Sequence, residues 1–114
     1  MRDHSKLKVF ALADSLALAV YRESRTLPDG ERYGLQSQVR RAAVSIATNI
    51  VEGCARSTQA EYARFIEIAF GSARELQYEI GLCEKLGYLK TDHEHCTNTA
   101  KALNGLLRAL RSTQ

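Results

Sequence analysis

The densest group of chemically active side chains in this sequence is the run Asp92-His-Glu-His-Cys96. Carboxylate, imidazole and thiolate groups are all metal ligands, so the run has the chemistry of a zinc or iron site. However, His93 and His95 are two residues apart and would point to different sides of a helix. A di-iron bundle also needs carboxylates from all four helices and a Glu-x-x-His motif on two of them, a pattern that this chain lacks. We therefore predict no metal site and no cofactor.

Groups suited to acid–base or nucleophilic catalysis are equally sparse. Glu75 and Glu79 are four residues apart, and we expect them on an outer flank of a helix, where they would pair with Arg74, Lys85 or a neighbouring subunit. The sequence contains no Gly-x-Ser-x-Gly elbow, no Cys-His signature and no glycine-rich phosphate loop. We therefore predict that the protein is not an enzyme.

Basic side chains offer a different chemistry, because guanidinium groups pair well with phosphate oxygens. Two sets of residues are candidates for contacts with RNA or DNA: arginines in the middle of the chain and a basic strip near its end. These residues are Arg41, Arg56, Arg64, Arg74, Lys101, Arg108 and Arg111. The interpretation that we favour is that the arginines form structural ion pairs and that the strip is a solvated outer face, with phosphate contacts as the alternative. Few aromatic residues interleave with the strip, so it does not suggest base stacking.

A polar series recurs every three or four residues in the middle of the chain. It consists of Gln38, Arg41, Ser45, Asn49 and Glu52. Residues with this spacing share one side of a helix, where paired polar groups fix the register of a helix interface. A ligand pocket lined by Asn49 and Glu52 is the alternative, and it would make the protein a small-molecule binder.

Four amphipathic segments must hold these side chains in place. Apolar residues recur every three or four positions in each of them, which predicts four helices. The segments are Lys6–Ser24, Tyr33 to Val51 or Glu52, Gln59–Leu86, and a last one whose apolar stripe runs from Cys96 to Leu110.

Local signals indicate where these helices begin and end. Pro28-Asp29-Gly30 predicts a turn after the first helix. We expect Gly53 to end the second helix in the left-handed conformation. Thr58-Gln-Ala-Glu61 is typical of a capping box, and Thr91-Asp-His-Glu94 repeats this pattern before the fourth helix. Because short connections force consecutive helices together, the prediction is one all-α domain, residues 1–114, folded as an up-and-down antiparallel four-helix bundle.

The second helix has more apolar surface than one bundle core requires. One of its sides fits the core, and an adjoining side is a candidate interface between copies of the chain. On this adjoining side, Arg40 suits a buried or interfacial ion pair. Gly71 in the third helix would let another backbone approach closely, although a tolerated surface glycine is the alternative. The candidate interface residues are Arg40, Val44, Ala47, Val51, Gly71 and Ser72.

Composition limits the remaining classes of function. The net charge of +3 permits nucleic-acid binding without demonstrating it. Three cysteines without a CxxC pair, and a start without a secretory signal, predict a reduced, cytoplasmic protein. No stretch approaches the roughly 18 consecutive apolar residues of a membrane-spanning helix, so we expect the apolar faces to be buried in protein.

Three sequence motifs point to a known family. They are Leu35-x-x-Gln-x-Arg-Arg-Ala-x-x-Ser-Ile-x-x-Asn-Ile-x-Glu-Gly-x-x-Arg56, then Arg64-Phe-x-x-Ile-Ala-x-Gly-Ser-x-x-Glu-Leu76, and Leu86-Gly-Tyr-Leu89. With them, from about Phe10 to Leu89, the chain resembles the bacterial four-helix-bundle family that includes proteins encoded in intervening sequences of the 23S rRNA gene. It is more distantly similar to accessory proteins of diversity-generating retroelements.

The resemblance implies a closed bundle that assembles into a homo-oligomeric ring, a pentamer, with no established catalytic activity. This agrees with the second apolar face found on the second helix. We therefore expect a non-enzymatic binding or scaffold component whose main partner is itself. An accessory protein that binds RNA or DNA is the alternative, since the retroelement proteins engage a reverse transcriptase and nucleic acid, but it rests on analogy of fold.

Overall fold

Four α-helices form the protein, whose computed structural model describes residues 1–89 and 93–112. They are α1 (Lys8–Glu23), α2 (Leu35–Cys54), α3 (Gln59–Lys85) and α4 (His93–Ser112). Three short 3-10 helices accompany them, η1 (His4–Lys6), η2 (Ser24–Thr26) and η3 (Asp29–Glu31).

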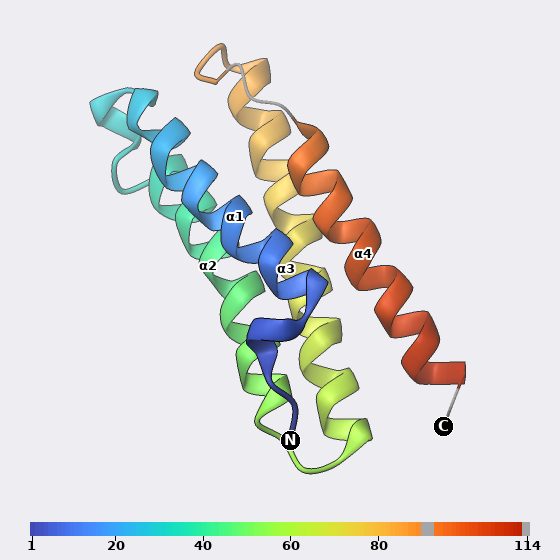
Figure 1. The fold of residues 1–114 in the computed structure, drawn as a ribbon. Helices are drawn as coiled ribbons and strands as arrows, with labels where there is room; N and C mark the ends of the chain where they lie inside the picture. Colours follow the sequence, from blue (N-terminus) through green and yellow to red (C-terminus); the bar gives the residue numbers. More distant parts are fainter. Residues whose placement is uncertain (90–92, 113–114) are drawn as a thin grey trace.

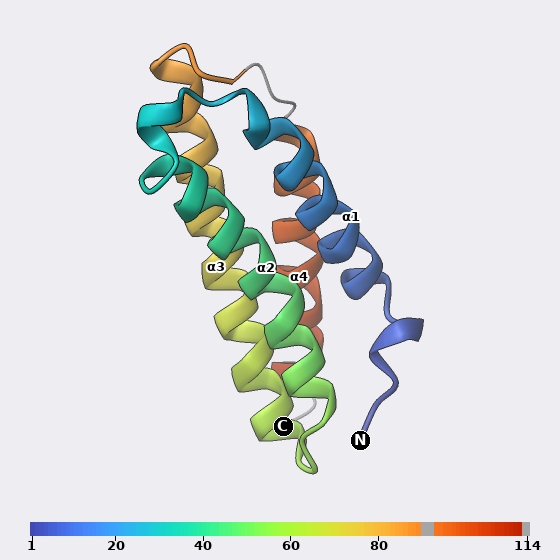
Figure 2. The same cartoon turned by 90° about the vertical axis from the view of Figure 1, so that its left-hand side faces the viewer.

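The four helices run alternately up and down along the long axis of the molecule (Figure 1). Each helix packs against the next, and α1 also contacts α4, so the bundle is closed. Figure 2 shows α1 and α2 side by side, joined at one end by the turns that contain η2 and η3. The described residues contain no strand. The predicted all-α, up-and-down four-helix bundle is confirmed.

The core follows from the spacing of apolar residues, because side chains three and four positions apart share one face of a helix. All four helices contribute to one continuous apolar cluster. Its largest fully buried members include Ile46 and Ile50 from α2, Tyr62 and Ile66 from α3, and Leu103 from α4. The inner stripes predicted from the sequence therefore meet in a common core.

The ends of α3 show how local sequence fixes the helix boundaries. The Thr58 hydroxyl accepts a hydrogen bond from the Glu61 backbone N–H (3.2 Å) and donates one to the Glu61 carboxylate (3.0 Å). At the other end, Gly87 has a φ of 76°, and the N–H groups of Gly87 and Tyr88 donate to the carbonyls of Glu84 and Cys83. The predicted start of α3 is correct. The second predicted capping box begins at Thr91, which lies outside the described residues.

Gly53 does not have the predicted left-handed conformation, because α2 continues to Cys54 and Gly87 is the only described residue with a positive φ. Gly53 is buried where α2 meets α3. A Cβ atom at this position would lie 2.9 Å from Cβ of Phe65 and 3.2 Å from Cδ1 of Tyr62. Gly53 therefore allows α2 and α3 to pack closely. The local sequence does not distinguish this role of a glycine from the role of ending a helix.

Candidate functional surfaces

The predicted interface residues of α2 face the side of the bundle that α1 borders. Val44 is 37% exposed, whereas Ala47 and Val51 are partly buried. Arg40 is held by the end of α1: its Nε donates to the Ser24 hydroxyl (2.8 Å) and an NH2 group donates to the carbonyl of Tyr21 (3.2 Å). These partners are neutral groups of the same chain, so Arg40 forms no ion pair among the described residues of one subunit. An ion pair of Arg40 across a subunit interface stays a prediction.

Helix α1 adds an apolar residue that the sequence analysis missed. The guanidinium of Arg40 lies 4.7 Å from the ring centroid of Tyr21, which fixes the register of the two antiparallel helices. Because the helices are antiparallel, we infer that Leu18, one turn before Tyr21, lies near the level of Val44, one turn after Arg40. Leu18 is 55% exposed. We refer to Leu18, Val44, Ala47 and Val51 as the α1–α2 strip.

A second apolar strip follows the outer side of α3. Ile68 and Tyr78 are exposed there, and no atom lies within 4 Å of the position that a Gly71 side chain would occupy. We call Ile68, Gly71 and Tyr78 the α3 strip. The neighbouring Ser72 serves a different contact, because its hydroxyl lies 2.9 Å from that of Ser45 and joins α3 to α2.

The polar series of α2 borders a hollow of about 390 Å³ between α2 and α3. Its lining residues are Gln38, Arg41, Ala42, Ser45, Ser72 and Glu75. The Asn49 amide donates to the hydroxyl (3.1 Å) and the carbonyl (2.8 Å) of Ser45, whereas Glu52 forms an ion pair with Arg56 (2.7 Å). The structure thus brings three members of the series into one hollow, but Asn49 and Glu52 do not line it.

Glu79 is buried, so the prediction that it lies on an outer flank of the third helix is wrong. The side chain is only 4% exposed and Oε1 has no hydrogen-bond partner among the described residues. Burial, followed by the nearby carboxylate of Glu75, raises the pKa of Glu79 to about 7. Glu79 lies at the edge of the inner apolar stripe of α3, where the burial of a side chain depends on how the neighbouring helix packs against α3. Spacing within one helix does not reveal that placement.

The remaining predicted nucleic-acid contacts lie on several parts of the bundle. Arg64 and Arg111 line one hollow between α3 and α4, and Arg74 and Lys101 line another. Arg111 forms an ion pair with Glu67 (2.7 Å), and Arg108 is exposed. In the same way, Glu52 neutralises Arg56, and the hollow that Arg41 lines also contains Glu75.

The candidate metal ligands near the start of α4 have other contacts. Nε2 of His93 contacts the Glu84 carboxylate, which joins α4 to the end of α3. The buried Cys96 thiol donates to the carbonyl of Ala73 (3.6 Å), and burial raises its pKa to about 12. Asp92 lies outside the described residues. Among the residues that the structure does describe, no group of three or more His, Cys, Asp or Glu side chains is placed to hold a metal ion.

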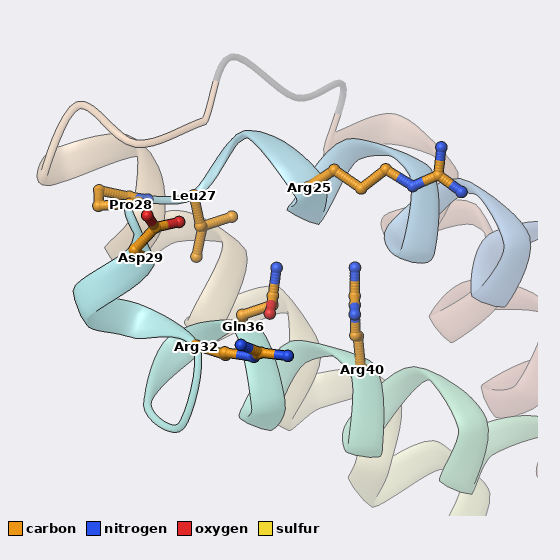
Figure 3. Close-up of a pocket in the computed structure, with 7 residues that line it drawn as sticks. All are labelled: Arg25, Leu27, Pro28, Asp29, Arg32, Gln36 and Arg40. Atoms are coloured by element: carbon orange, nitrogen blue, oxygen red, sulfur yellow. The ribbon is translucent and has the colours of Figure 1, made fainter.

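A further hollow, of about 290 Å³, lies at the end of the bundle where α1 is joined to α2. Three arginines line it, Arg25, Arg32 and Arg40, together with Gln36 and Asp29. Figure 3 shows Gln36 and Arg40 reaching from α2 toward the η2 turn, with Arg25 along the opposite rim. Arg25 and Arg32 were not predicted as site residues, because they flank a turn and belong to no periodic helix face.

Comparisons with known proteins agree with the fold. The family described as 23S rRNA-intervening sequence protein matches residues 5–109, which is most of the chain. No curated protein is similar enough to give a match. None of the helices in the described ranges combines the length and the apolar character needed to cross a membrane. The extent of the family match and the four-helix architecture lead to one conclusion: the chain belongs to the 23S rRNA-intervening sequence protein family.

Proposed function

We propose that the protein assembles into a homo-oligomeric ring and works as a non-enzymatic binding or scaffold component. The observation that supports this proposal is that one bundle exposes apolar side chains on two different surfaces: Leu18 and Val44 in the α1–α2 strip, and Ile68 and Tyr78 in the α3 strip. A ring forms when two different surfaces of a subunit meet head to tail and the rotation closes. The two strips provide such a pair of surfaces.

Burial provides the driving force for this assembly. Fully burying an exposed aliphatic side chain contributes about 1.5 to 3 kcal/mol. Because Leu18 is 55% exposed and Val44 37% exposed, each would contribute only a part of that to a contact. On the other strip, Gly71 presents no side chain, and the space around it is open. A helix of a second subunit can therefore approach the α3 backbone there. The family resemblance implies a pentamer as the closed ring.

Replacing Val44 with glutamate should convert the assembly to monomers, because a charged group would be buried in the contact without a partner. Size-exclusion chromatography with light scattering measures the change in mass, and circular dichroism checks that the variant remains helical. Gly71→Leu tests the α3 strip and should also reduce the mass. Asn98→Glu, an exposed position on α4, is the matched control and should assemble normally. A monomeric parent protein, or full-size assemblies of both Val44→Glu and Gly71→Leu, would refute the ring.

A further inference from the structure

We propose that the hollow lined by Arg25, Arg32 and Arg40 binds an unpaired nucleotide, with its phosphate on the arginines and its base against the ring of Tyr33. This is a binding site beyond the assembly proposed above. The three arginines come from η2, from the turn before α2 and from α2 itself (Figure 3). They therefore border one concave space although they are up to 15 residues apart.

The charge of the hollow favours an anion. Three guanidinium groups line it against the single carboxylate of Asp29. Within residues 1–89 and 93–112, none of the three arginines forms an ion pair. The guanidinium groups of Arg25 and Arg32 are therefore available for paired hydrogen bonds to phosphate oxygens, whereas Arg40, which already donates to Ser24 and Tyr21, adds positive charge.

Two side chains of the hollow are already held in place. The Arg40 guanidinium is fixed by the Ser24 hydroxyl, the Tyr21 carbonyl and the Tyr21 ring. The Gln36 amide nitrogen donates to the carbonyl of Ser24 (3.0 Å), which leaves the amide oxygen available to a ligand donor. Because these groups are ordered before a ligand arrives, less conformational entropy is lost on binding.

Tyr33 distinguishes a nucleotide from a simple anion. It is 89% exposed and lies next to Arg32, whose guanidinium is 5.9 Å from the Tyr33 ring centroid and also lines the hollow. An aromatic ring that remains this exposed beside an arginine without an ion pair can stack an unpaired base while the arginine neutralises the phosphate. A base inside a duplex has no free face to offer, so the site fits single-stranded nucleic acid or a free nucleotide.

The other basic hollows fit this ligand less well. Between α3 and α4, Arg111 is already neutralised by Glu67, and the neighbouring hollow with Arg74 and Lys101 is only about 160 Å³. The hollow that contains Arg41 also includes Glu75. The end of the bundle at α1 and α2 is therefore where positive charge, concave shape and an exposed aromatic ring coincide.

Fluorescence anisotropy with a labelled 12-nucleotide single-stranded RNA tests the site in the full-length protein. Arg32→Glu should weaken binding by about tenfold or more, and Arg25→Glu should act in the same direction. Tyr33→Ala should weaken it by about fivefold or more, whereas Tyr33→Phe keeps the ring and should bind normally. Lys8→Glu makes the same charge change at the far end of α1 and should have little effect. Affinity of the parent protein should fall as salt increases.

Two further measurements identify the ligand. Competition by AMP that depends on Arg32 and Tyr33 would assign the site to free nucleotides, and failure of AMP to compete would assign it to a strand. Light scattering of the same variants measures whether they still assemble. Because Arg25, Arg32 and Tyr33 lie outside both apolar strips, the variants should keep the mass of the parent protein, so that a loss of RNA binding is distinguished from a loss of assembly. Unchanged RNA affinity in Arg32→Glu and Tyr33→Ala, or equal affinity for a duplex of the same sequence, would overturn the proposal.

Discussion

Replacing Glu79 with glutamine should stabilise the folded protein at pH 8 by about 2 to 3 kcal/mol. The Glu79 carboxyl is only 4% exposed and its Oε1 atom has no hydrogen-bond partner among the described residues. Burial and the nearby Glu75 carboxylate raise the pKa of Glu79 to about 7, so the group is ionised in an unfavourable environment at pH 8. Glutamine has nearly the same shape and carries no charge.

The pH dependence follows from the direction of this pKa change. Below the ordinary value of 4.5, the carboxyl is protonated in both folded and unfolded chains and has no effect. Between 4.5 and about 7 the unfolded chain loses the proton first, so the free energy of unfolding decreases as the pH rises. Above that range both states are ionised and the full destabilisation, roughly 3 kcal/mol at most, is present. The advantage of glutamine should therefore grow from pH 4.5 to pH 8.

Urea unfolding of both proteins at pH 4.5, 6 and 8 measures this difference. Equal protein concentrations are needed, because assembly would couple the unfolding midpoint to concentration. Asp14→Asn removes an exposed carboxylate from α1 and should leave the pH dependence as it is in the parent protein. A stability difference between the parent and Glu79→Gln that is the same at all three pH values would contradict the assignment.

The helices could be predicted because their signals are local. An apolar residue every three or four positions marks the side of a helix that is buried, whatever its neighbours are. The start of α3 after Thr58 could also be predicted, because a capping box spans only four residues. The short connections between consecutive helices then allow only a few arrangements of four helices in a bundle.

The features that the sequence analysis missed depend on how the helices meet. Gly53 is set by the contact of α2 with α3, Glu79 by how neighbouring helices cover α3, and Arg40 by the register of α1 against α2. The hollow with Arg25 and Arg32 is formed by a turn that folds back over α2. Periodicity within a single helix contains no information about such contacts.

Gly53→Ala should destabilise the bundle by about 1 to 2 kcal/mol, although alanine is normally the better helix former. The new Cβ atom would lie 2.9 Å from Cβ of Phe65 and 3.3 Å from the carbonyl oxygen of Tyr62. Neither is the end of a flexible side chain, since one atom is attached directly to the α3 backbone and the other belongs to it. Relief would therefore require α3 to move away from α2 and loosen the core around Tyr62.

Gly105→Ala provides the matched comparison, because Gly105 lies within α4 and no atom comes within 4 Å of its Cβ position. The same substitution there should stabilise the protein by about 0.5 to 1 kcal/mol. The two alanine variants should thus differ in opposite directions from the parent when urea unfolding is measured at one protein concentration. Stabilisation by both substitutions would mean that Gly53 is not a packing glycine, and that α2 and α3 have room to accept a methyl group. Opposite effects would instead establish that the α2–α3 contact requires the absence of a side chain at this position.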